Sequence, residues 1–219
     1  MLDGLLPDEV RGAWGDPRED APFGLPAEEA LIERAVDKRK REFRKARACA
    51  RSLLAEFGVH DFALLAGAQR EPLWPDGLVG SVTHTDGMCA VVVGSSFRYA
   101  GIGIDVEPDE PLTLPIAQRV CVPGEMEQVS ERTGLSSLQA ARLIFSAKEA
   151  FYKCQFCVTQ RYLGFGDVRV EFSPGGCFSV SVLAQESEVA AIAANSGRWA
   201  QREGFLLTSS WLRQKLEAT

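Results

Sequence analysis

The tightest constraint on the fold is a pair of apolar runs separated by Asp86 and Gly87. Residues 78–82 and 88–93 are rich in valine and lie on either side of this pair. An Asp-Gly pair in that position is typical of a hairpin turn, because such turns need backbone angles that these two residues adopt readily. Residues 98–107 are predicted to form a further strand. The sequence therefore predicts a small sheet that begins with a hairpin.

A strongly basic helix is predicted before these strands. Between Glu33 and Arg51 the chain has nine lysines and arginines against three acids, so this stretch carries +6 and the remainder −12. Apolar residues recur there at steps of three and four, the period of one buried helical face: Phe43, Ala46, Ala50, Leu54 and Phe57. The cations could form a solvated face or an anion site. A pI near 5.1 favours a small phosphorylated ligand over nucleic acid.

The second half of the chain repeats the order of a helix followed by strands. Ser136 and Gln139 are spaced as a capping box at the start of a helix. A second hairpin is predicted for 167–172 and 177–183, which are joined through Ser-Pro-Gly-Gly, and a last strand for 204–209.

The stretch from Pro108 to Pro115 is interpreted as a linker between these two parts. We therefore predict an α+β fold with two similar halves, residues 1–108 and 109–219, although no internal repeat is visible in the sequence.

Composition places the chain among globular proteins. Its 219 residues are 46% apolar and 25% charged, which excludes a disordered chain and a disulfide scaffold. The acidic start is no leader, and no apolar run approaches the roughly 20 residues that a membrane span needs, so we expect a cytoplasmic protein. The six cysteines are predicted to be buried free thiols, because Cys154 and Cys157 have no histidine nearby to complete a zinc site.

The segment Gly103-Ile104-Asp105-Val106-Glu107 is the first candidate site. Strand alternation puts Asp105 and Glu107 on one face while Ile104 and Val106 point into the core. Two carboxylates on one side suit a hard divalent ion such as Mg²⁺, although an exposed edge strand could also present them to water. The glycines do not form a dinucleotide loop, because the third glycine of that motif is missing.

Two further segments carry groups that could act on a phosphate. Glu149 and Lys153 are four residues apart in the orientation that favours a helical ion pair, which could be an ordinary surface salt bridge. His84 lies among hydroxyl residues at the end of a predicted strand, where it could hold a phosphate or play a structural role.

Taken together, these segments resemble the 4′-phosphopantetheinyl transferases of the surfactin- and enterobactin-synthetase type. The resemblance extends from Lys38 to about Leu207 and rests on five motifs in the right order. They are Glu-Phe followed by Ala-Arg-x-Cys-Ala-Arg in the basic helix, Glu-Pro-x-Trp-Pro-x-Gly at 71–77, Ser-x-x-His at 81–84, Gly-Ile-Asp-x-Glu at 103–107 and Lys-Glu-x-x-x-Lys at 148–153.

The resemblance implies a monomer of two similar halves, each a small antiparallel sheet with helices, that binds coenzyme A and Mg²⁺ in the cleft between them. Such an enzyme moves the 4′-phosphopantetheine arm from coenzyme A onto a serine of an acyl or peptidyl carrier protein and releases adenosine 3′,5′-bisphosphate. It thereby activates polyketide, nonribosomal peptide or siderophore synthases, and it needs neither nucleic acid nor a membrane.

The resemblance also implies roles for individual residues. Asp105, Glu107 and Glu149 would hold Mg²⁺, with the Val106 backbone near it. Lys153 would contact the phosphate under attack, and Glu149 or a metal-bound water would take the serine proton. The coenzyme A phosphates would be bound by Arg39, Arg47, Arg70, Thr83, His84, Lys148 and Lys153. Arg70 is the least direct match, since it would replace from the next position a lysine that several relatives have.

Two rival functions are compatible with the same residues. A regulator that binds coenzyme A or nucleic acid would use the basic helix without catalysis, and a Mg²⁺-dependent phosphodiesterase or nuclease would use the acids and the lysine for attack by water. For the carrier protein, Lys40, Arg44 and Arg51 of the basic helix could form the docking surface. The alternative is an apolar surface near Glu125 and Met126.

Overall fold

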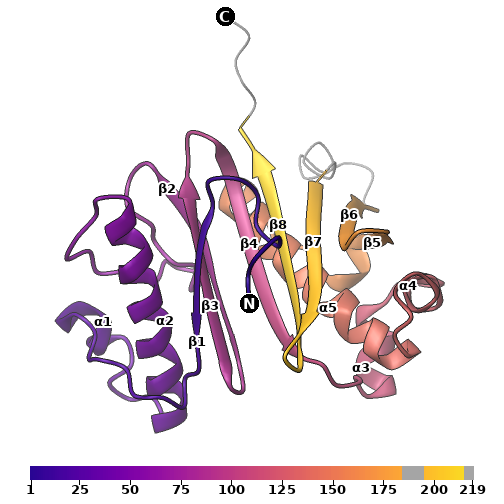
Figure 1. Cartoon of the computed structure of the whole chain (residues 1–219), viewed down its shortest axis with the longest axis horizontal. Coiled ribbons are helices and arrows are strands. Elements are labelled where there is room, and N and C mark those ends of the chain that lie inside the picture. Colours follow the sequence, from indigo (N-terminus) through magenta and orange to yellow (C-terminus); the bar gives the residue numbers. More distant parts are fainter. Residues whose placement is uncertain (184–194, 215–219) are drawn as a thin grey trace, which may run out of the picture.

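The computed structural model describes residues 1–183 and 195–214, whose strands form two antiparallel sheets (Figure 1). The three-stranded sheet has the order β1-β3-β2 and the five-stranded sheet the order β4-β8-β7-β6-β5. The strands are β1 Arg11–Gly15, β2 Leu78–Thr85, β3 Met88–Ser95, β4 Tyr99–Pro108, β5 Val168–Ser173, β6 Cys177–Val182, β7 Asn195–Arg202 and β8 Phe205–Arg213. The predicted α+β class with two antiparallel sheets is confirmed.

Helices lie against one face of the three-stranded sheet and behind the central strands of the five-stranded sheet (Figure 1). They are α1 Pro26–Ala30, α2 Asp37–Glu56, α3 Leu114–Val120, α4 Glu125–Thr133 and α5 Ser137–Thr159, with a single 3-10 turn, η1, at Phe165–Asp167. Helix α2 packs on the three-stranded sheet, while α5 packs on β4 and β8. One group of buried residues includes Ile104 of β4, Val92 of β3 and Leu207 of β8, so the core is continuous between the two sheets.

The two hairpins and the two long helices of the prediction are confirmed. Thr85 pairs with Met88 across the first turn, in which Gly87 has a φ of +80°, and β5 pairs with β6. The linker prediction was wrong in part, because α3 begins at Leu114. Strands β1 and β7 and helix α4 were not predicted. The five-stranded sheet includes β4, which pairs with β8, and the division at residue 108 stays a prediction.

Close packing of α5 on β4 depends on two glycines. A Cβ atom on Gly103 would lie 1.8 Å from the carbonyl oxygen of Ala150, and one on Gly101 would lie 2.2 Å from that of Cys154. Both obstacles are backbone atoms of α5, so a rotamer change could not relieve the clash. The glycines that precede Asp105 are therefore explained by helix–strand packing, and they bring the site residues of the two elements together.

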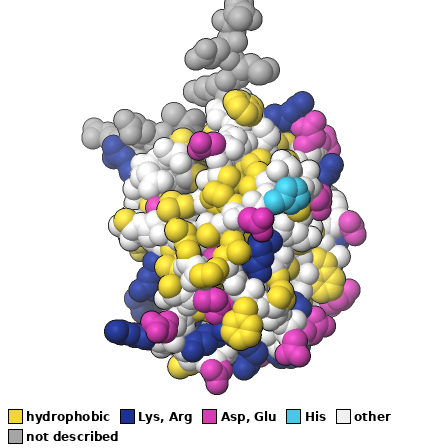
Figure 2. Space-filling model, turned by 90° about the vertical axis from the view of Figure 1, so that its left-hand side faces the viewer, with side chains coloured by type: hydrophobic (Ala, Val, Ile, Leu, Met, Phe, Trp, Pro, Cys, Tyr) yellow, Lys and Arg dark blue, Asp and Glu magenta, His cyan; other side chains and the backbone are white. Residues whose placement is uncertain are grey.

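The basic helix α2 is partly neutralised by α1. Glu28 is fully buried and accepts hydrogen bonds from Arg51 Nη1 at 2.7 Å and from the Leu64 amide at 3.0 Å. Arg44 forms an ion pair with Glu29 at 2.7 Å. Two of the three cations that were considered for carrier docking are thus occupied within the protein. Figure 2 shows acidic, basic and apolar side chains mixed over the face that includes α1 and α2.

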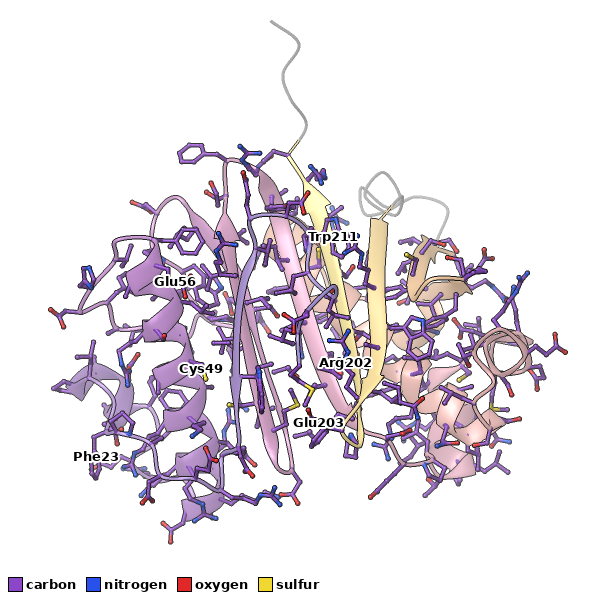
Figure 3. All side chains as sticks on the ribbon, viewed as in Figure 1. Phe23, Cys49, Glu56, Arg202, Glu203 and Trp211 are labelled. Carbon is purple, nitrogen blue, oxygen red and sulfur yellow. The ribbon has the colours of Figure 1, made fainter. Side chains whose placement is uncertain are left out.

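The N-terminal segment crosses the five-stranded sheet and is held there by hydrogen bonds. Arg202 (Figure 3) donates to the Met1 carbonyl at 2.8 Å, and the Ser209 hydroxyl donates to the Leu5 carbonyl at 2.6 Å. Residues far apart in sequence are thereby joined across β7 and β8. Within residues 1–183 and 195–214, no helix has the length and apolar character needed to cross a bilayer.

All six cysteines are free thiols, as predicted, but their burial differs. Cys89 and Cys154 are buried, whereas Cys157 and Cys177 are exposed. Cys49 of α2 faces the three-stranded sheet (Figure 3) and is partly buried. The expectation of uniform burial was therefore wrong, because Cys177 begins the short strand β6 and Cys157 lies near the end of α5.

We predict that Gly103→Ala lowers the free energy of unfolding by about 3 kcal/mol, since the new methyl group overlaps the Ala150 carbonyl. Gly166→Ala is the matched control: a Cβ atom there meets no atom within 4 Å, and its effect should stay within about 0.5 kcal/mol. Urea denaturation of both variants measures the difference. Equal stability of the two variants would contradict the packing role of Gly103.

Candidate functional site

One face of α5 carries the residues that lie over β4. Arg142, Ser146, Glu149 and Lys153 follow one another at steps of four, three and four, which places them along one side of a helix. Ser146 contacts the hydroxyl of Thr208 in β8 at 2.8 Å. This face therefore looks onto the central strands of the five-stranded sheet.

Each of the two acids of β4 faces a cation of α5. Lys153 Nζ lies 2.7 Å from Asp105 Oδ1, and Arg142 Nη1 lies 2.7 Å from Glu107 Oε2. Val106 between them is buried in the core, so Asp105 and Glu107 share one side of the strand as their spacing predicts. The structure thus joins the Gly-Ile-Asp-x-Glu and Lys-Glu-x-x-x-Lys segments in one cluster.

Asp105 is the most enclosed acid of this cluster. Its Oδ1 also accepts a hydrogen bond from the Thr83 hydroxyl at 2.9 Å, while its Oδ2 is buried and has no hydrogen-bond partner. A buried carboxylate oxygen without a partner is energetically costly unless a cation or a donor reaches it. The buried Thr83 hydroxyl is directed at Asp105, so it would act on a ligand through that carboxylate.

Burial and like charges act on the acids together. Burial raises the pKa of Glu107, and the nearby Asp105 charge raises it further. Burial also raises the pKa of Glu149; Lys153 opposes this shift, while Asp105 and Glu107 add to it. In the described residues, no three His, Cys, Asp or Glu side chains are arranged as a ready-made metal site. The oxygen donors and the unpartnered Asp105 Oδ2 nevertheless fit a hard divalent cation.

A cavity of about 580 Å³ beside this cluster is lined by several cations. It brings together four residues that the sequence assigned to an anion: Arg39, Arg47, Arg70 and His84. Arg47 is buried, donates from Nε to the Leu64 carbonyl at 2.8 Å, and has its pKa lowered to about 10 by burial. These side chains come from α2, from β2 and from the loop before β2, so the cavity is formed only in the folded chain.

His84 lies among charged groups at the mouth of this cavity. Its Nε2 contacts Arg39 Nη1 and lies 3.3 Å from Glu42 Oε2. Burial lowers the pKa of His84, and the charge of Arg39 lowers it further, so the imidazole is neutral at pH 7 before an anion binds. Sequence reasoning missed Glu42, although its position three residues after Arg39 could have indicated a pair on one helical face.

Lys148 points neither into the acid cluster nor into the cationic cavity. It is buried, and its Nζ donates to Glu125 Oε2, to the Val120 carbonyl and to the Phe165 carbonyl, each at 2.9 Å. An ammonium group has three N–H bonds, and all three are used. We therefore leave Lys148 out of the coenzyme A site. Its partner Glu125 is also fully buried, which gives it a structural place in the second half.

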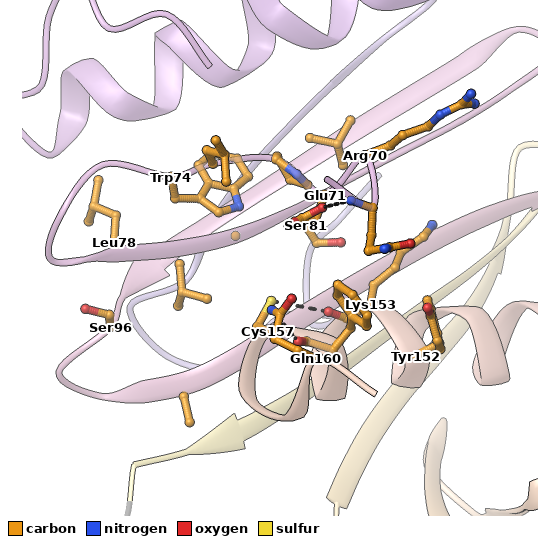
Figure 4. Close-up of a pocket in the computed structure, with 18 residues that line it drawn as sticks. Arg70, Glu71, Trp74, Leu78, Ser81, Ser96, Tyr152, Lys153, Cys157 and Gln160 are labelled. Atoms are coloured by element: carbon orange, nitrogen blue, oxygen red, sulfur yellow. Dashed lines mark hydrogen bonds between the residues drawn. The ribbon is translucent and has the colours of Figure 1, made fainter. Parts of the chain in front are cut away.

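A second large cavity, of about 550 Å³, lies between β2 with its preceding loop and the C-terminal part of α5 (Figure 4). Lys153, Tyr152 and Cys157 line it from α5, and Trp74 lines it from the loop. Arg70 lines both this cavity and the cationic one. The two cavities therefore adjoin, with the Lys153–Asp105 pair beside them.

This fold and site define a class of protein: a two-sheet α+β chain that sets paired carboxylates and a lysine beside a cationic cavity. Two family models match it, the 4′-phosphopantetheinyl transferase N-terminal domain over residues 27–94 and the 4′-phosphopantetheinyl transferase superfamily over residues 101–207. The chain therefore belongs to the 4′-phosphopantetheinyl transferases, enzymes that transfer the phosphopantetheine arm of coenzyme A to carrier proteins. The resemblance seen in the sequence is confirmed.

Curated relatives match nearly the whole chain. It is 40% identical to the 4′-phosphopantetheinyl transferase Npt of Nocardia iowensis, over 95% of this chain and 98% of that protein. It is 38% identical to the 4′-phosphopantetheinyl transferase PptT of Mycobacterium tuberculosis, over 90% of this chain and 88% of that protein. It is 30% identical to enterobactin synthase component D of Salmonella typhimurium, over 87% of this chain and 79% of that protein.

We predict that the two lysines of the Lys-Glu-x-x-x-Lys segment differ in their effect on stability. Lys148→Ala should lower the free energy of unfolding by about 3–5 kcal/mol, because it leaves the buried Glu125 charge unpaired. Lys153→Ala should cost less, about 1.5–3 kcal/mol: it leaves Asp105 with the Thr83 hydrogen bond, and the Lys153 side chain is 26% exposed and borders a cavity that admits water. Urea denaturation measures both. A larger loss of stability in Lys153→Ala than in Lys148→Ala would contradict the structural role of Lys148.

Proposed function

We propose that this chain transfers the 4′-phosphopantetheine arm from coenzyme A to a serine of an acyl or peptidyl carrier protein, with Mg²⁺, and releases adenosine 3′,5′-bisphosphate. The observation that carries the proposal is the contact of Lys153 with Asp105 next to a cavity lined by Arg39, Arg47, Arg70 and His84. This arrangement offers cations to a phosphorylated ligand and acids to a metal ion in one continuous site.

Coenzyme A would place its phosphorylated adenosine end in the cationic cavity. Arg39 and His84 are at least partly accessible there, whereas Arg47 is buried and can reach a phosphate only through its guanidinium tips, since its Nε is already bonded to Leu64. The diphosphate would then extend towards Lys153. Lys153 lines the second cavity, which shares Arg70 with the cationic cavity. Lys153 would offset the charge that develops on the phosphate under attack.

Asp105, Glu107 and Glu149 are the residues that would hold Mg²⁺, together with the Val106 backbone. A bound Mg²⁺ would neutralise the diphosphate and polarise its oxygens. Glu149 has a second possible task. Because burial raises its pKa, this carboxylate is a stronger base than an exposed glutamate, and it would take the proton of the serine hydroxyl.

The carrier surface and the oligomeric state belong to the same proposal. We infer that the enzyme acts as a cytoplasmic monomer on its carrier, without nucleic acid or membrane. Because Arg44 and Arg51 are paired with α1 and Lys38 is paired with Asp86 at 3.1 Å, basic-helix docking would depend on Lys40 and the exposed Arg41. The apolar surface near Met126 is the competing site. Increased salt should weaken the first mode and leave the second largely unchanged.

A labelling experiment separates this function from its rivals. Apo carrier protein incubated with coenzyme A, Mg²⁺ and the enzyme should gain the mass of one phosphopantetheine per carrier, and a carrier whose serine is changed to alanine should gain none. Lys153→Ala should slow transfer by about 10²–10³-fold, as expected for loss of one charge-stabilising group. Coenzyme A hydrolysis without labelling would indicate a phosphodiesterase. Binding without either reaction would indicate a regulator.

We predict that adenosine 3′,5′-bisphosphate binds with uptake of a proton at His84. The pKa of His84 is below its ordinary value in the free protein, and a phosphate dianion beside it raises that pKa. Affinity should therefore fall as the pH rises through the pKa of the complex. Calorimetry in buffers of different ionisation enthalpy counts the protons. The uptake should vanish in His84→Ala and persist in His60→Ala, which changes the other histidine of the chain; unchanged uptake in His84→Ala would exclude this role.

A further inference from the structure

Arg142 is a charged neighbour of the acid cluster to which no motif assigns a task. It stands seven residues before Glu149, two turns earlier on the same face of α5. Its side chain and that of Glu107 are only 19% and 17% exposed. The pair is therefore much less screened by solvent than an ordinary surface salt bridge, whose contribution is close to zero.

The contacts of Arg142 fix the direction of its guanidinium group. Nη1 donates to Glu107 Oε2 at 2.7 Å, and Nε donates to the Glu110 carbonyl at 3.1 Å. One partner lies within β4 and the other lies just past its end. Because the guanidinium group is planar and its Nη1 and Nε are both hydrogen-bonded, it has little freedom to rotate.

Both acids of β4 are held in the same way, each by one oxygen. Lys153 and Thr83 bind Asp105 Oδ1, and its Oδ2 has no partner. Arg142 binds Glu107 Oε2, and among the described residues no hydrogen bond reaches Glu107 Oε1. Two carboxylates on the same side of one strand thus each keep one oxygen available. This is the arrangement that a cation bound by single oxygens of both groups requires.

We propose that Arg142 is a positioning residue that holds Glu107 by Oε2 so that Oε1 faces the metal and diphosphate site. The proposal rests on the function proposed above and adds a residue outside the recognised motifs. Arg142 also offsets the repulsion between Glu107 and Asp105 before the metal binds. Residues that orient metal ligands in this way typically change metal affinity by about 10–100-fold.

The alternative is that Arg142 merely fastens α5 to β4. A fastening role predicts loss of stability without a change in metal affinity. The two roles are separated by the binding of Mn²⁺, a paramagnetic substitute for Mg²⁺, to the full chain. Free Mn²⁺ can be measured by electron paramagnetic resonance, so the readout does not depend on turnover.

The experiment compares four variants with the unchanged protein. Arg142→Met keeps the bulk and removes the charge, and Arg142→Lys restores the charge without the planar fork. Arg132→Met changes an exposed arginine of α4 and is the matched control, while Asp105→Asn removes a direct ligand. Thermal unfolding of each variant confirms that it is folded at the temperature of the titration.

We expect the Mn²⁺ dissociation constant to rise about 10–100-fold in Arg142→Met, to recover partly in Arg142→Lys and to stay unchanged in Arg132→Met. The KM for Mg²⁺ in carrier labelling should rise in parallel, with the KM for coenzyme A at saturating Mg²⁺ within about twofold. Unchanged Mn²⁺ affinity in Arg142→Met, together with lost affinity in Asp105→Asn, would overturn the role of Arg142 alone. Absence of Mn²⁺ binding by the unchanged protein would overturn the metal site itself and this inference with it.

Discussion

The contact between α5 and β4 is the constraint on which the site depends. Gly101 and Gly103 let the backbone of the helix approach the strand to a distance that any side chain would prevent. Lys153 can reach Asp105 only because of this approach, and Arg142 reaches Glu107 farther along the same contact. The glycines of one motif and the charges of the other are therefore two parts of a single packing arrangement.

The contact between α5 and β4 also explains how three acidic side chains can lie close together in the folded protein. Burial raises the pKa of Glu107 and of Glu149, and the charge of Asp105 adds to both shifts. Two cations from α5 offset part of this repulsion. A diphosphate would compete for Lys153, and a divalent cation would compete for the acids. The ion pairs therefore describe the site without ligands. On binding, a diphosphate would replace the acid beside Lys153, and a metal ion would replace the cation beside the acids.

Much of the fold could be predicted from short-range patterns, and the rest depends on contacts between distant residues. The Asp86-Gly87 turn and the period of α2 identify their elements locally. Strand β1, with the sequence RGAWG, has no alternation of its own and is a strand because it pairs with β3. The pairing of Arg51 with Glu28 and of Arg142 with Glu107 joins residues more than 20 positions apart. Spacing in the sequence could not indicate either pair.

The two lysines of α5 show why a motif and a site are different things. Lys148 and Lys153 are five residues apart, so they project to different sides of the helix. Lys148 binds the Val120 and Phe165 carbonyls in the second half, which fixes the rotation of α5 about its axis. Glu149 is the next residue, so its direction is fixed by the same contact. Lys148 can therefore influence the chemistry at Glu149 while none of its own N–H bonds is free for a ligand.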